Sequence, residues 1–235
     1  MKILAIDTAS ARCSAALWLD GPGLHRSVAT AREHAQLLLP FVDELLREAR
    51  LRLTDLDVIA FGRGPGSFTG LRVACSVAQG LALGAGLPVL PVSDLRALAA
   101  QACHTLAPRE APNRVVACMD ARMGEVYWAE FQLRDGRPDD SQVIERVGPP
   151  DSVASAGGQG VTAGIGAGFS AWPALADRLG IRPVDLLAGM EPDARDVAWL
   201  AAGDLAAGRE AGAAETAQPV YLRDNVAFVP GKRSL

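Results

Sequence analysis

Two aspartates follow similar apolar stretches of the sequence and could together hold a metal-bound nucleotide. Asp7 ends the first stretch, and Asp120 ends a second one about 110 residues later. Carboxylates at the ends of strands are suitable ligands for hard cations such as Mg²⁺. A glycine directly after the acid would let a phosphate approach the backbone, but Thr8 follows Asp7 and Ala121 follows Asp120. The two acids therefore indicate either a weakened nucleotide cleft or simple caps of turns.

The glycine-rich segment 62–70, with the sequence GRGPGSFTG, is the most specific motif of the chain. It lies between a predicted strand and a predicted helix, where backbone N–H groups could bind an anion. Pro65 removes one of those donors, and a P-loop also needs a lysine that reaches the phosphates. The lysines of the chain, Lys2 and Lys232, lie far from this segment. The motif therefore favours a tight turn that lets strand and helix pack closely.

Small residues form a stripe on the helix that follows this turn. Gly70, Ala74 and Ala78 recur at every fourth position, so another backbone could approach this face closely. We expect the stripe to contact a helix of a second subunit, although it could also reflect a composition with 42 alanines. The branched residues of the same helix would then be free to face the sheet: Leu71, Val73, Val77 and Leu81.

The histidines and cysteines form no pattern typical of a metal site. His25, His34 and His104 each lack a second histidine three or four positions away. The four cysteines include no C-x-x-C pair, and scattered single cysteines are typical of a reduced cytoplasmic protein. No Ser–His–Asp arrangement is recognisable either. We therefore expect neither a bound metal nor catalytic residues.

Composition limits the class of protein and its partners. Hydrophobic residues make up 49% of the chain and charged residues 21%, which is typical of a folded core and not of a disordered chain. The net charge of −4 and the absence of a basic run argue against a protein that binds nucleic acid on its own. Residues 73–93 are uncharged, but glycines and prolines divide them into a buried helix and a strand, so no membrane segment is expected.

Hydrophobic periodicity predicts a mixed sheet covered by helices in the first 105 residues. The expected order is β-β-β-α-β-α-β-α, with Ser67 and Ser93 as helix caps. The predicted strands span residues 2–7, 13–19, 24–30, 58–62 and 88–92, and the predicted helices span about 38–49, 67–85 and 93–104.

The second half of the chain repeats the opening pattern of a strand, an acid, a second strand and a glycine turn. This repeat predicts two related lobes that face each other across a cleft, with Asp7 and Asp120 at equivalent strand ends. The first lobe would span residues 1–105 and be rejoined by 216–235, and the smaller second lobe would span 106–215. We expect a strand at 161–165 and helices at 172–179 and 195–207 in that second lobe. The cleft candidates are Asp7, Thr8, Ser10, Asp120, Gly164 and Gly166.

Five blocks of the sequence resemble the bacterial TsaB (YeaZ) family in the same order along the chain. They are residues 2–8, residues 32–34 ahead of Leu39-Pro40, residues 62–72, residues 120–127 and residues 219–223. The resemblance implies the two-lobed α/β fold of actin, Hsp70 and the sugar kinases (the ASKHA fold), built from duplicated ribonuclease-H-like lobes with the second lobe reduced.

The resemblance also implies a role in the threonylcarbamoyladenosine modification of tRNA next to the anticodon. In that system the catalytic paralogue TsaD transfers the threonylcarbamoyl group, TsaE is an ATPase, and TsaB is a non-catalytic subunit required for the modification. The chain would bind and activate TsaD, self-associate as a homodimer, and reach tRNA only through the complex. It would bind no cofactor alone, with ATP and Mg²⁺ possible at the assembled complex.

Members of the family self-associate through helices of the first lobe, which indicates where a partner would bind here. The matching residues are Gly70, Leu71, Ala74, Val77, Ala78, His34 and Leu38. TsaD-like proteins carry a His-x-x-x-His metal pair, whereas Leu38 follows His34 in this chain. The alternative function is a nucleotide-binding, kinase-like ATPase that uses Asp7 and Asp120.

Overall fold

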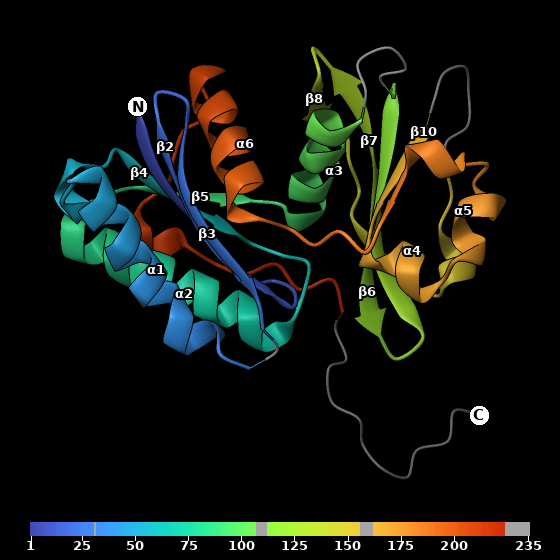
Figure 1. The fold of residues 1–235 in the computed structure, drawn as a ribbon, viewed down its shortest axis with the longest axis horizontal. Helices are drawn as coiled ribbons and strands as arrows, with labels where there is room; N and C mark the ends of the chain where they lie inside the picture. Colours follow the sequence, from blue (N-terminus) through green and yellow to red (C-terminus); the bar gives the residue numbers. More distant parts are fainter. Residues whose placement is uncertain (31, 107–111, 156–161, 224–235) are drawn as a thin grey trace, which may run out of the picture.

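Two β-sheets, each accompanied by helices, make up the computed structural model of the chain (Figure 1). The structure describes residues 1–30, 32–106, 112–155 and 162–223. The first sheet contains β1 (Lys2–Asp7), β2 (Arg12–Leu19), β3 (Pro22–Ala29), β4 (Val58–Gly62) and β5 (Val89–Val92). The second contains β6 (Arg114–Arg122), β7 (Glu125–Arg134), β8 (Arg137–Asp139), β9 (Arg146–Gly148), β10 (Thr162–Gly166) and β11 (Leu186–Ala188). The helices are α1 (His34–Ala49), α2 (Phe68–Ala85), α3 (Asp94–Thr105), α4 (Ala167–Ala171), α5 (Ala174–Arg178) and α6 (Ala194–Ala206).

The two sheets have the same strand plan, which confirms the predicted duplication. The first sheet has the order β3-β2-β1-β4-β5, with β1, β2 and β3 antiparallel and β4 and β5 parallel to β1. The second has the order β8-β7-β6-β10-β11 with the same directions, and β9 also pairs with β7. Asp7 ends β1, and Asp120 lies near the end of the equivalent strand β6.

Helices cover both faces of the first sheet. α1 and α2 lie side by side on one face, and α6 lies on the other (Figure 1). The side chain of Ser67 accepts a hydrogen bond from the N–H of Gly70 at 3.4 Å, and that of Ser93 accepts one from Arg96 at 3.1 Å. Both caps predicted from the sequence are therefore confirmed. α2 is also long and apolar enough to cross a membrane by length and composition, but here it packs on the sheet.

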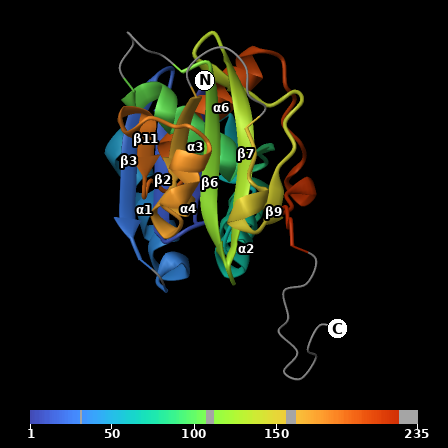
Figure 2. The same cartoon turned by 90° about the vertical axis from the view of Figure 1, so that its right-hand side faces the viewer.

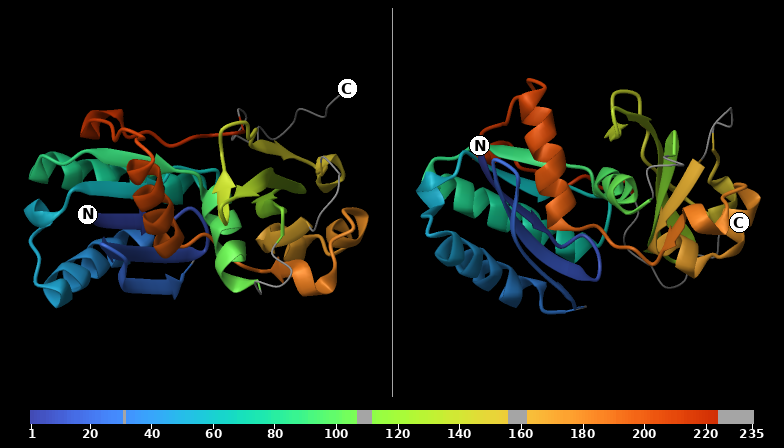
Figure 3. Two further views of the ribbon diagram at one scale, coloured as in Figure 1. Left: turned by 90° about the horizontal axis from the view of Figure 1, so that it is seen from above. Right: turned by 45° about the horizontal axis from the view of Figure 1, so that its top comes forward.

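The predicted lobe boundaries require a correction at two helices. α6, expected in the second lobe, packs on β1, β2 and β4 of the first sheet, where Val197 and Leu200 join a core with Ile3. α3, expected in the first lobe, packs on β6, β7, β8 and β10 and lies between the sheets (Figure 3). Periodicity identifies the buried face of a helix but not the sheet that buries it.

The chain returns to the first lobe well before residue 216. Beyond α6, Ala214 and Ala217 belong to the core under α1 and α2, and the N–H of Val220 donates to the carbonyl of Arg63 at 2.7 Å. Residues 224–235 of the predicted returning segment lie outside the described residues. The second lobe is built around its own sheet, with α4 beside β6 (Figure 2).

Candidate functional site

The carboxylate of Asp7 is fully buried and does not face the space between the lobes. Its Oδ1 accepts a hydrogen bond from the N–H of Ala9 at 3.0 Å, and its Oδ2 lies beside Asp94. Burial, more than any other cause, raises the pKa of Asp7 and raises that of Asp94 well above its usual value. The prediction that Asp7 could hold a nucleotide metal in the cleft is corrected, because its carboxylate has no open face.

Other predicted cleft residues are also buried. The hydroxyl of Thr8 donates to the carbonyl of Gly70 at 2.7 Å. Gly166 lies against the backbone of Cys118, and Gly164 lies against Phe169. Among the cleft candidates, all of which the structure describes, only Ser10 and Asp120 line the cleft. These glycines serve close packing of the second lobe and not the approach of a phosphate.

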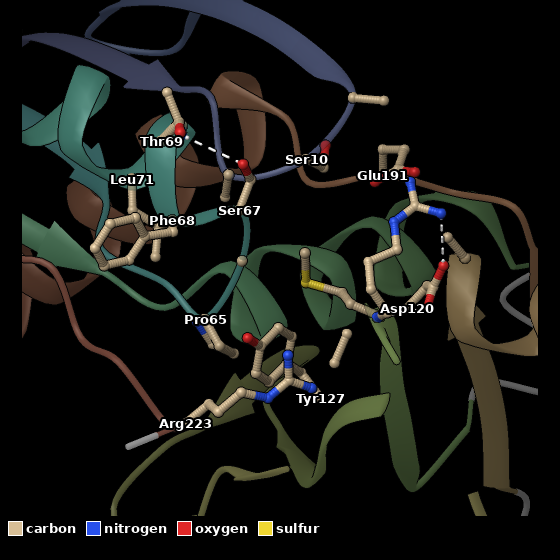
Figure 4. Close-up of a pocket in the computed structure, with 18 of the residues that line it drawn as sticks. Ser10, Pro65, Ser67, Phe68, Thr69, Leu71, Asp120, Tyr127, Glu191 and Arg223 are labelled. Carbon is tan, nitrogen blue, oxygen red and sulfur yellow. Dashed lines mark hydrogen bonds and ion pairs between the residues drawn. The ribbon is translucent and has the colours of Figure 1, made fainter. Parts of the chain in front are cut away.

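A cleft of about 880 Å³ separates the two lobes (Figure 4). Ser67 and Phe68 line it from the first lobe, and Asp120 and Tyr127 from the second. Glu191, on the connection between the lobes, also lines the cleft, and burial raises the pKa of its carboxyl group. Within the described ranges, no group of three His, Cys, Asp or Glu residues could hold a metal ion.

Two arginines that line the cleft form ion pairs with neighbouring acids. Arg122 donates to Asp120 at 3.0 Å, and Arg223 forms an ion pair with Glu125. The segment that carries Arg223 also places the ring of Tyr221 against Phe68, with 5.1 Å between centroids. This segment therefore contacts both lobes along the rim of the cleft. Because Arg122 already pairs with it, the partly exposed Asp120 is a weak candidate for nucleotide chemistry.

The small-residue stripe of α2 faces the sheet and not the solvent. Ala74 and Ala78 are 0% exposed, and Leu71 is 1% exposed. A Cβ atom on Gly70 would collide with the carbonyl oxygen of Thr8, so only glycine lets α2 approach β1 this closely. Leu38 of α1 is also fully buried. The predicted interface is corrected at Gly70, Leu71, Ala74, Ala78 and Leu38, because small residues allow close approach to a sheet as well as to a helix.

His34 and Val77 are the members of the predicted interface that remain partly exposed. His34 lines the cleft, while Val77 lies among other half-buried apolar residues of α1 and α2. We call this surface the α1–α2 face. It comprises Leu37, Phe41, Val73, Val77 and Leu81, with the exposed side chains of Leu39 (49%) and Leu83 (53%) on the same helices. A partly exposed apolar surface on two neighbouring helices is a candidate for protein binding.

Comparison with known proteins identifies the family. A family model described as TsaD, tRNA N6-adenosine threonylcarbamoyltransferase, matches residues 25–158. The chain is 43% identical over 240 residues to the tRNA threonylcarbamoyladenosine biosynthesis protein TsaB of Escherichia coli (strain K12), covering 99% of this chain and 100% of that protein. The chain belongs to the TsaB family. The solved structure of YeaZ from Pseudomonas aeruginosa superposes with a TM-score of 0.83 at 43% identity, over 94% of this chain and 99% of that one.

Membership of the TsaB family agrees with the duplicated sheets. The resemblance found from five sequence blocks is confirmed, and so is an α/β fold built from two similar mixed sheets. The TsaB protein of Bacillus subtilis (strain 168) is a more distant relative, 31% identical over 154 residues that make up 65% of this chain and 62% of that protein.

Sequence reasoning missed the partner of Asp7. Asp94 was expected only as part of a helix, although it follows directly after a strand and a serine cap. The available signal was topological: β1, β4 and β5 are parallel neighbours, so Asp7, Gly62 and Asp94 meet at one edge of the sheet. The contacts of Glu191 and Tyr221 gave no comparable signal in the sequence.

Proposed function

We propose that the chain is a non-catalytic subunit required for the threonylcarbamoyladenosine modification of tRNA. The observation that carries this proposal is the 43% identity to Escherichia coli TsaB over 99% of the chain. The chain would act in the cytoplasm, bind and activate a TsaD paralogue, and work together with the ATPase TsaE. It would reach tRNA through the assembled complex, since a net charge of −4 does not favour independent binding to a phosphate backbone.

The α1–α2 face supports the proposed binding of TsaD or of a second copy of the chain. Its centre is apolar and half-buried, as the core of a protein interface usually is. This face replaces the small-residue stripe as the proposed contact surface. ATP and Mg²⁺ would bind, if at all, at the assembled complex and not in the cleft of the single chain.

Reconstitution of the modification tests the proposal directly. TsaD, TsaE, the enzyme that supplies the threonylcarbamoyl donor, and unmodified tRNA are combined with and without this chain. We expect the modified nucleoside to form only when the chain is present. Equal formation in its absence would contradict the proposal.

Val77→Arg is expected to weaken binding to TsaD strongly while the chain stays folded. A long charged side chain at the centre of the α1–α2 face would lose its hydration on complex formation without gaining a partner. We expect at least about a tenfold loss of affinity, or 1.4 kcal/mol, in a titration of TsaD. Val184→Arg is the matched control, because Val184 is 71% exposed in the second lobe. Unchanged affinity of Val77→Arg would exclude this face.

The ATPase alternative requires Asp7 in the cleft, and Asp7 is buried beside Asp94. We therefore expect a calorimetric titration of the isolated chain with Mg-ATP to give no saturable heat at micromolar concentrations. Submicromolar binding would contradict the view of the chain as a scaffold. Asp120→Asn, which removes the charge that faces the cleft, would then show whether that binding uses the cleft.

A further inference from the structure

We propose that Asp7 and Asp94 share a single proton in the folded chain and that this carboxyl pair is a proton-dependent clamp on the loop that connects β4 to α2. The proposal concerns the folded chain itself and does not depend on the proposed function. It rests on how three neighbouring parallel strands end at one edge of the first sheet.

The topology of the sheet brings the two acids together. Asp7 is the last residue of β1, Gly62 is the last residue of β4, which lies between β1 and β5, and Asp94 follows shortly after β5. A Cβ atom on Gly62 would collide with Oδ2 of Asp7 and with Oδ1 of Asp94. The missing side chain at Gly62 therefore leaves the space in which the carboxyl groups from the two flanking strands meet.

Each carboxyl group uses one oxygen for the backbone and turns the other toward its neighbour. Oδ1 of Asp7 accepts from the N–H of Ala9 at 3.0 Å, and Oδ2 of Asp94 accepts from the N–H of Gly64. The remaining oxygens, Oδ2 of Asp7 and Oδ1 of Asp94, are buried and find no hydrogen-bond donor in the described part of the chain. Two bare carboxylates would repel each other there, whereas one shared proton converts the repulsion into a hydrogen bond.

The charges around the pair favour one proton and not two. His34 on α1 favours the charged form of Asp7, and Arg63 after β4 favours the charged form of Asp94. Asp193, ahead of α6, opposes the charge on Asp7. Burial, and to a lesser extent the charge of Asp7, raises the pKa of the nearby groups Cys13 and Glu191. Because both positive and negative groups surround the pair, the pair is expected to keep one negative charge and one proton.

The clamp links protonation to the loop that leads into α2. Asp94 holds the N–H of Gly64, and the adjacent Arg63 accepts from Val220 through its carbonyl at 2.7 Å. Because burial raises the pKa of both acids, the folded chain binds a proton that the unfolded chain releases in the ordinary range of aspartate. Stability contributed by the shared proton is therefore present at low pH and is lost as the pH rises through the raised pKa of the pair.

Asparagine substitutions test the shared proton. In Asp94→Asn, the amide oxygen can still accept from Gly64, while the NH₂ group donates permanently to Asp7. In Asp7→Asn, the amide oxygen can still accept from the N–H of Ala9, while the NH₂ group donates to Asp94. We expect the urea midpoint of the parent chain to fall as the pH rises through the raised pKa of the pair, and each single variant to show a clearly smaller fall. Asp185→Asn, at a buried acid bound to Arg182 at 2.6 Å, is the matched control and should keep the parental fall.

The double variant Asp7→Asn/Asp94→Asn provides the sharpest outcome. It places two NH₂ groups against each other where one hydrogen bond is needed, so its midpoint should lie below those of both single variants. A double variant as stable as the singles would overturn the proposal.

Infrared difference spectra give a readout without unfolding: the parent at neutral pH should show a carboxylic-acid C=O band that Asp94→Asn lacks. The absence of that band from the parent would also overturn the proposal.

Discussion

Ala74→Arg is expected to unfold the first lobe and not merely to block a partner. Ala74 is 0% exposed, and it lies on the face of α2 that packs against the sheet, between Gly70 and Ala78. An arginine there would bury an unpaired charge and overfill a close contact, and each of these effects alone costs several kcal/mol. We expect a loss of more than about 4 kcal/mol, which is a large part of the 5–15 kcal/mol that usually stabilises a domain.

Urea unfolding followed by circular dichroism measures this loss. Val77→Arg is the matched control on the same helix, because Val77 is partly exposed and should accept the guanidinium at little cost. The two substitutions thus separate folding from binding. Ala74→Arg should lose both the stability of the fold and the binding of TsaD, whereas Val77→Arg should lose only the binding. An Ala74→Arg variant that unfolds at the parental urea concentration would show that the stripe of Gly70, Ala74 and Ala78 is not packed against the sheet in solution.

The strands of the first sheet, the duplication and the family could be predicted from the sequence, but the three-residue strands β8, β9 and β11 and the orientation of α2 could not. Buried strands such as β4 are short apolar runs with clear ends, and serine caps such as Ser67 mark where helices begin. The stripe of Gly70, Ala74 and Ala78 allows close approach to any backbone, whether it belongs to a sheet or to a second helix. Only the packing of α2 on β4 shows that the stripe contacts the sheet and not a second helix, and this packing depends on residues far apart in the sequence.

The candidate cleft was harder to predict because its chemistry depends on contacts between distant parts of the chain. The sequence correctly indicates an acid at the end of β1, yet the role of Asp7 is decided by Asp94, which is 87 positions away. Two acids that share a buried site act differently from one acid that faces water. Likewise, α6 has the periodicity of any amphipathic helix, and nothing in residues 194–206 indicates that it crosses back to the first sheet.

Arg96→Ala is expected to destabilise the junction between the lobes by about 3–5 kcal/mol. The guanidinium of Arg96 binds both oxygens of Asp204 on α6, at 2.7 and 2.8 Å, and donates to the carbonyl of Pro138 in β8 at 3.0 Å. It therefore ties α3 to α6 and to the second sheet. The side chains of Arg96 and Asp204 are only 7% and 8% exposed, so removing one charge leaves the other buried with fewer partners. Arg209, at 3.0 Å from Asp204, compensates in part.

Two comparisons show whether the loss comes from the buried charge of Asp204, which keeps only Arg209 as an ionic partner in Arg96→Ala. Arg47→Ala breaks an ion pair with Asp43 in which both side chains are largely exposed, and it should cost less than about 1 kcal/mol. The double variant Arg96→Met/Asp204→Leu replaces both charges by apolar side chains and should recover most of the stability lost in Arg96→Ala. A double variant as unstable as Arg96→Ala would indicate that the hydrogen bonds of Arg96, and not the stranded carboxylate, hold the junction. All three are measured as free energies of unfolding in urea at one pH, so that the pH dependence of stability does not enter the comparison.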